Sequence, residues 1–88
     1  MTEAWVYILQ CSDGSYYTGW TTDVLKRYQN HCSGKGARYT RSHPPVAIVY
    51  RQQCSDRSEA MKREAAIKKL SRREKEKLIC EYQKGIVL

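Results

Sequence analysis

The sequence predicts a small α+β domain (α/β in the broad sense) in which helices flank a three-stranded antiparallel sheet. Two apolar and aromatic runs, residues 5–9 and 15–20, flank a short turn, and residues 46–50 form a third run after two prolines. Runs of this kind are typical of strands. Three stretches with the apolar spacing of helices lie between or after them, which gives the order β-β-α-β-α-α. We expect residues 1–88 to form one domain around one core.

The first two strands are expected to form a hairpin, and its loop length decides which side chains meet. A two-residue turn at Asp13-Gly14 would send Tyr7 and Tyr17 to opposite faces of the sheet. A three-residue loop, with Gly14 in the left-handed conformation, would instead pair Tyr7 with Gly19. Tyr7 and Tyr17 would then share one face, because cross-strand neighbours point the same way.

The next segment predicts a helix that begins at the threonine pair 21–22 and ends at residues 33–34. One of the two threonines would be the N-cap, and Asp23 in the first turn would favour the helix dipole. Arg27 and His31 are four residues apart, so they are neighbours on one face of this helix.

A basic loop is expected after this helix, from residue 34 to residue 41. Its cations, glycine amides and one aromatic ring could bind the phosphates and bases of a nucleic acid. The candidate nucleic-acid-binding residues are Lys35, Arg38, Tyr39 and Arg41. Residues 46–50 follow as a nearly continuous apolar strand, which is expected at the centre of the sheet.

The second predicted helix carries an apolar stripe that contains a carboxylate. Ala60, Met61 and Ile67 lie within about 60° of Glu64 around the helix at 100° per residue. Glu64 is therefore expected inside the stripe that faces the core. A third helix is predicted over residues 71–83, and it opens with an S-x-x-E capping box.

The amino-acid composition indicates which kind of partner the protein binds and in which cellular compartment it is expected. The formal net charge is +7, which favours a polyanion, with nucleic acid ahead of an anionic membrane surface. The four cysteines contain no C-x-x-C pair and no signal peptide is evident, so reduced thiols and a cytoplasmic protein are expected. No apolar stretch approaches the length of a membrane span, and no obligate protein partner is evident.

Five polar residues lie where core residues are expected: Tyr7, Tyr17, Arg27, His31 and Glu64. Burying unpaired charge is costly, so folding alone gives no reason for this placement. Taken singly, the tyrosines could be half-buried strand residues, His31 a capping residue, and Arg27 with Glu64 a structural ion pair. Taken together, the five predict one site.

These residues resemble the GIY-YIG nuclease family over about residues 4–80. Residues 5–7 match the first motif of that family and residues 17–19 the second, at the expected separation. Arg27 lies ten residues after the tyrosine of the second motif, and residues 59–64 look like the stretch that ends in the family's metal-binding glutamate. His31 lies where members carry a histidine or a tyrosine.

The chain looks most like the small stand-alone bacterial branch of this family, and it departs from the pattern at three places. Trp5 replaces the glycine that opens the first motif. Trp20 lies where repair-type members carry a lysine. The late asparagine of several nucleases has no clear counterpart.

The resemblance implies a metal-dependent nuclease that acts on DNA, or on RNA, with weak sequence selectivity. Glu64 would bind one Mg²⁺ or Mn²⁺ ion, and Arg27 would hold an oxygen of the reacting phosphate. Tyr17 would take a proton from the attacking water, Tyr7 would orient that water, and His31 could share the proton transfer. Whether Tyr17 or His31 is the base stays open. The alternative is a nucleic-acid-binding module that retains the fold without efficient chemistry.

Overall fold

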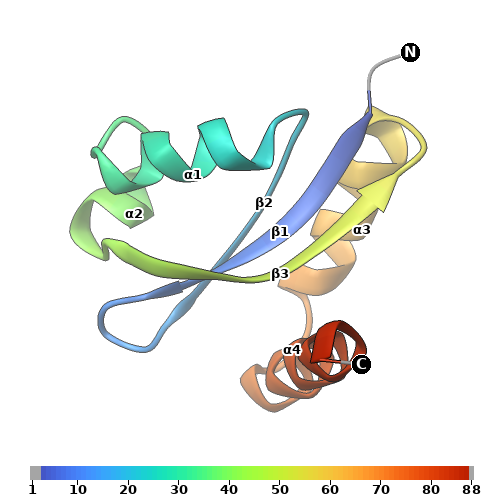
Figure 1. Cartoon of the computed structure of the whole chain (residues 1–88). Coiled ribbons are helices and arrows are strands. Elements are labelled where there is room, and N and C mark those ends of the chain that lie inside the picture. The colour runs from blue at the N-terminus through green and yellow to red at the C-terminus, as the bar shows by residue number, and fades with distance from the viewer. Residues whose placement is uncertain (1–2, 88) are drawn as a thin grey trace.

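The computed structural model describes residues 3–87, with side chains up to residue 85. It contains a three-stranded antiparallel sheet with helices on both faces (Figure 1). The elements are β1 (Ala4–Cys11), β2 (Tyr16–Thr21), α1 (Val24–Cys32), α2 (Arg38–Ser42), β3 (Pro45–Cys54), α3 (Arg57–Lys68) and α4 (Arg72–Val87). The predicted fold class and element order are confirmed, with α2 as an addition. None of the helices within residues 3–87 is long and apolar enough to cross a membrane.

The hairpin of β1 and β2 has the register that brings the two tyrosines to one face. Tyr7 pairs with Gly19 and Leu9 pairs with Tyr17. Gly14 has a φ of +86°, the left-handed conformation that closes a three-residue loop and that glycine adopts without a steric penalty. The three-residue alternative is therefore the correct one.

The strand order β2-β1-β3 places β1 at the centre, so the expectation that residues 46–50 form the central strand is wrong. The continuous apolar run in β3 has another cause. Pairing shifts between Ile8, which faces Tyr50, and Leu9, which faces Ile48, so Val49 is an extra residue in the ladder. This irregularity interrupts the alternation of faces and lets Val49 and Tyr50 both be buried, at 8% and 6% exposure.

The two faces of β1 carry separate hydrophobic clusters. Ala4, Val6 and Ile8 pack with α3 and α4, whose buried members are Ala60, Ile67 and Ile79. On the opposite face, Tyr7 and Leu9 pack with Val24 of α1. This division follows from the two-residue period of a strand, and it means that every odd-numbered residue from Trp5 to Leu9 faces the helix that carries Arg27 and His31.

The buried face of α3 is narrower than the sequence predicts. Ala60 and Ile67 are fully buried, whereas Met61 is 52% exposed, so the expected packing of Met61 in the core is wrong. The stripe is centred on Ala60 and Ile67, and Glu64 lies at its margin with a side chain that is 22% exposed. Glu64 is thus neither free in solvent nor enclosed in the core.

Helix α1 is capped by Asp23 and not by a threonine. The Asp23 carboxylate accepts a hydrogen bond from the backbone amide of Lys26 at 3.1 Å. Thr21 accepts from the amide of Asp23 at 3.2 Å, so it positions the cap residue instead of acting as the cap.

We predict that Asp23→Ala destabilises the protein by about 1 kcal/mol, because one amide at the start of α1 loses its acceptor. For an 88-residue domain this corresponds to a fall in Tm of roughly 4–8 °C. Thermal unfolding measures it, with Glu76→Ala on exposed α4 as the control that leaves the Tm nearly unchanged. An equal fall in Tm in both variants would argue against a stabilising role of Asp23 as the N-cap of α1.

Candidate active site

The centre of the site is the buried imidazole of His31, which is 1% exposed and held at both ring nitrogens. Its Nε2 lies 2.9 Å from the Tyr7 hydroxyl, and its Nδ1 lies 2.7 Å from the Thr40 hydroxyl. The Thr40 hydroxyl donates its hydrogen to the carbonyl of Ala37 at 2.9 Å, so its oxygen accepts from Nδ1–H. Nε2 is then unprotonated and accepts from Tyr7. The Ala37 amide approaches Nδ1 at 3.4 Å, which would favour the other tautomer; we assign the proton from the two shorter contacts.

Two glycines make room for this pair. A Cβ on Gly19 would lie 2.5 Å from the Tyr7 hydroxyl oxygen, because the Tyr7 side chain crosses over the backbone of β2 at this point. A Cβ on Gly36 would collide with the His31 ring and would lie 2.9 Å from the His31 Cα. The glycine of the second motif therefore has a steric reason, namely the close approach of Tyr7.

Tyr17 extends the cluster of rings on the same face. Its ring centroid is 5.1 Å from that of His31 and 6.0 Å from that of Tyr39, which stacks nearly parallel to it. Tyr39, on α2, stacks in turn on His43 at 4.2 Å, and its hydroxyl donates to Ser15 at 2.6 Å. Helix α2 thus brings Tyr39 against the site, whereas the sequence predicts only a loop.

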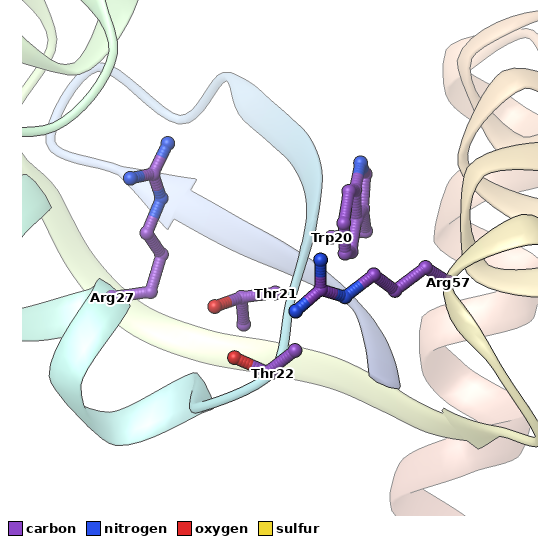
Figure 2. Close-up of a pocket in the computed structure, with 5 residues that line it drawn as sticks. All are labelled: Trp20, Thr21, Thr22, Arg27 and Arg57. Carbon is purple, nitrogen blue, oxygen red and sulfur yellow. The ribbon is translucent and has the colours of Figure 1, made fainter. Parts of the chain in front are cut away.

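Arg27 lies one turn before His31 on α1 and is partly buried. Its Nε is buried without a hydrogen-bond partner among residues 3–85. The guanidinium lines a cavity of about 400 Å³ together with Trp20, Thr21, Thr22 and Arg57 (Figure 2). Such an arginine has donors free for a ligand, and its fork matches phosphate oxygens.

Glu64 forms no ion pair with Arg27, so the structural ion-pair alternative is wrong. The only cation that the described part of the chain places within 4.0 Å of Glu64 is Lys68, at 3.7 Å, and Lys68 is itself 54% exposed. Such an exposed pair contributes little to stability. The carboxylate nevertheless acts on the tyrosines, because its negative charge contributes to raising the pKa of both Tyr7 and Tyr17.

Burial shifts the pKa of all three rings toward the uncharged form. It raises the pKa of Tyr7 to about 12 and also raises that of Tyr17, while the positive charge of Arg27 acts in the opposite direction. Burial also lowers the pKa of His31 below its ordinary value, and the charge of Arg27 lowers it further. At neutral pH the three rings are therefore uncharged. The charge of Arg27 acts on all three, and that of Glu64 acts on the two tyrosines.

The donor set limits the metal that the site could hold. No group of three or more His, Cys, Asp or Glu side chains gathers within the described residues, so a caged zinc site does not fit. Glu64 is the one carboxylate of the site. One carboxylate suits Mg²⁺ or Mn²⁺ only if the ion keeps several waters and takes substrate oxygens, as Mg²⁺ commonly does.

The candidate nucleic-acid-binding residues divide into two groups. Tyr39 packs against the site rings, whereas Lys35, Arg38 and Arg41 are exposed around α2 and bind none of the five site residues.

Two functional candidates were not found by sequence reasoning. Thr40, which is 1% exposed, carries no motif signal. Arg57 does carry one, since it lies seven residues before Glu64 and thus on the same face of α3.

We predict that the stability of the protein declines as the pH falls from 7.5 to 5 and that His31 causes part of this decline. The pKa of His31 is lower in the folded state than in the unfolded state. Its contribution is therefore complete above the pKa of the unfolded state and is lost as the pH falls from that value through the lower pKa of the folded state. His31→Gln should flatten the dependence of unfolding free energy on pH, while Gln29→Ala, exposed on the same helix, keeps the wild-type slope. An unchanged slope in His31→Gln would contradict the assigned neutral imidazole.

Comparison with known proteins identifies the family. The model of the GIY-YIG catalytic domain matches residues 3–77. The chain is 57% identical over 84 residues to the UPF0213 protein DP2720 of Desulfotalea psychrophila, covering 93% of this chain and 76% of that one. The solution structure of EF2693 from E. faecalis is 40% identical with a TM-score of 0.62, covering 94% and 88%. That of the UPF0213 protein BH0048 from Bacillus halodurans is 50% identical with a TM-score of 0.58, covering 89% and 83%. The chain therefore belongs to the GIY-YIG family of nuclease domains.

Proposed function

We propose that the protein is a divalent-metal-dependent endonuclease that hydrolyses phosphodiester bonds in DNA with weak sequence selectivity. RNA contains the same bond and is a second substrate to test. The observation that carries the proposal is the cluster of three uncharged rings, Tyr7, Tyr17 and His31. The charge of Arg27 lowers the pKa of all three, and the charge of Glu64 raises the pKa of the two tyrosines. In the proposed function, Arg27 would bind phosphate, the three rings would move a proton and Glu64 would bind the metal ion.

The proposed role of Arg27 is to stabilise the charge that develops on the phosphate oxygens. Its Nε has no partner within the described chain, so a phosphate that bound it would satisfy a buried donor. Preorganised donors of this kind supply large terms in catalysis. A divalent ion at Glu64 would supply further Lewis-acid charge to the same oxygens.

The hydrogen bond from Tyr7 to His31 favours these two residues as the proton path. As the attacking water gives its proton to the Tyr7 oxygen, the Tyr7 proton can pass to Nε2 of His31 over 2.9 Å. The resulting imidazolium would keep its bond to Thr40. Without substrate, burial and Arg27 hold the pKa of His31 low. A bound phosphate brings negative charge that opposes this effect and makes His31 a better acceptor. Tyr17, whose ring lies tilted against that of His31 at 5.1 Å between centroids, would then position the imidazole.

Substrate binding would depend mainly on the backbone of the nucleic acid. Lys35, Arg38 and Arg41 are exposed cations next to the site, and the net charge of +7 supports attraction to a polyanion. Tyr39 offers a ring face for base stacking. Contacts of these kinds carry little sequence information, so weak selectivity is expected.

We predict that Glu64→Gln loses at least about a hundredfold in cleavage rate, because it removes the metal-binding charge from the site. The assay uses labelled single-stranded, duplex and branched DNA and RNA, each with Mg²⁺, Mn²⁺ or EDTA. Glu76→Gln makes the same chemical change on exposed α4 and should keep the wild-type rate. The Tm of Glu64→Gln should stay close to that of the wild type, since the one pair it breaks is exposed.

Two results would contradict the proposal. Equal cleavage by Glu64→Gln and wild type would remove Glu64 from the chemistry. Binding of nucleic acid by the wild type without cleavage under any metal condition would favour the non-catalytic binding module.

A further inference from the structure

The cavity at the end of β2 brings together two arginines from different helices. Arg27 extends from α1, and Arg57 extends from the first turn of α3 toward Thr21 and Thr22 at the end of the strand, so side chains of both helices line the cavity (Figure 2). Trp20 supplies an aromatic wall on the side of α3. The volume of about 400 Å³ lies in the range of small-ligand sites.

The charges around this cavity are uncompensated. No carboxylate lines it, and within residues 3–85 neither Arg27 nor Arg57 lies in an ion pair. The nearest acidic residues in the sequence, Asp23 and Asp56, are the N-caps of α1 and α3 and accept from backbone amides of their own helices. Both guanidinium groups carry a positive charge, so an anion in the cavity would be attracted to each of them.

Arg27 belongs both to the cavity and to the candidate active site, and Arg57 lies on the same helix as Glu64. Arg57 and Glu64 are seven residues apart on α3, so they point in directions that differ by only about 20°. Along the helix axis they are separated by about 10 Å. A strand whose reacting phosphate lay at Glu64 and Arg27 would therefore continue past Arg57.

We propose that this cavity is a phosphate subsite for the nucleotide next to the cleaved bond. Arg57 binds the neighbouring phosphate through its planar fork, and Trp20 packs against the attached sugar or base. The inference rests on the proposed function and adds a substrate requirement to it. The preferred substrate is a continuous strand with a charged phosphate beside the scissile one.

A scan of neutral phosphates tests this subsite. Each oligonucleotide carries one methylphosphonate, and the set moves this neutral group one position at a time along the strand. The binding affinity of each is measured with Glu64→Gln, and the cleavage rate of each is measured with the enzyme that keeps Glu64. In both assays we expect one position next to the cut at which loss of the phosphate charge weakens the interaction roughly five- to tenfold. In proteins that also carry Arg57→Ala, this penalty disappears at that position alone. The slope of log Kd against log salt also falls by about one.

Arg73→Ala, an exposed arginine on α4, is the control and should keep the wild-type profile. The effect of each methylphosphonate position is compared within one variant. A general loss of stability would weaken binding to all substrates alike, so it cannot produce a change at one position alone. An identical penalty with and without Arg57 would overturn the subsite. If the strand is bound but not cut, the nuclease proposal fails and the binding profile alone decides on the subsite. If no strand is bound, both fail.

Discussion

The hydrogen bond between Tyr7 and His31 is the contact around which the rest of the site is built. It joins the central strand to helix α1 across the interior of the protein. To make it, the Tyr7 side chain crosses the backbone of β2, which only a glycine at position 19 allows, and the His31 ring fills the space beside Gly36. Thr40 holds the opposite side of the ring, so α2 is tied to the same bond. A strand, two helices and two glycines are thus coupled through one phenol and one imidazole.

The electrostatic design follows from burying those rings. The two phenols are uncharged at neutral pH even in water, and burial raises their pKa further; burial also lowers the pKa of His31, so the imidazole is neutral as well. The charges are held at the periphery, on Arg27 with an unsatisfied Nε and on Glu64 at the margin of α3. An anionic substrate would change the balance of the whole site, because it satisfies the arginine and raises the proton affinity of His31. The free protein and such a complex would therefore differ in protonation as well as in contacts.

Much of this arrangement could be predicted from the sequence, because it rests on short-range periodicity. The i, i+4 spacing put Arg27 and His31 on one face, and the period of a strand left two registers, one of which proved correct. Features that depend on distant partners could not be predicted. Burial of Thr40 requires the ring of His31, and the edge position of β3 depends on which side of β1 the hairpin leaves open. The exposure of Met61 depends on the angle at which α3 meets the sheet, which no periodicity encodes.

The central claim is that Glu64 and the Tyr7–His31 pair belong to one metal-binding site, and paramagnetic broadening by Mn²⁺ tests it most directly. Backbone amide signals are recorded by NMR during addition of substoichiometric Mn²⁺ to the wild type and to Glu64→Gln. The account predicts that signals of Tyr7, Gly19 and Glu64 broaden first in the wild type and stay sharp in the variant. Broadening centred on other carboxylates, such as Glu59 or Glu74, or broadening that Glu64→Gln does not change, would contradict it.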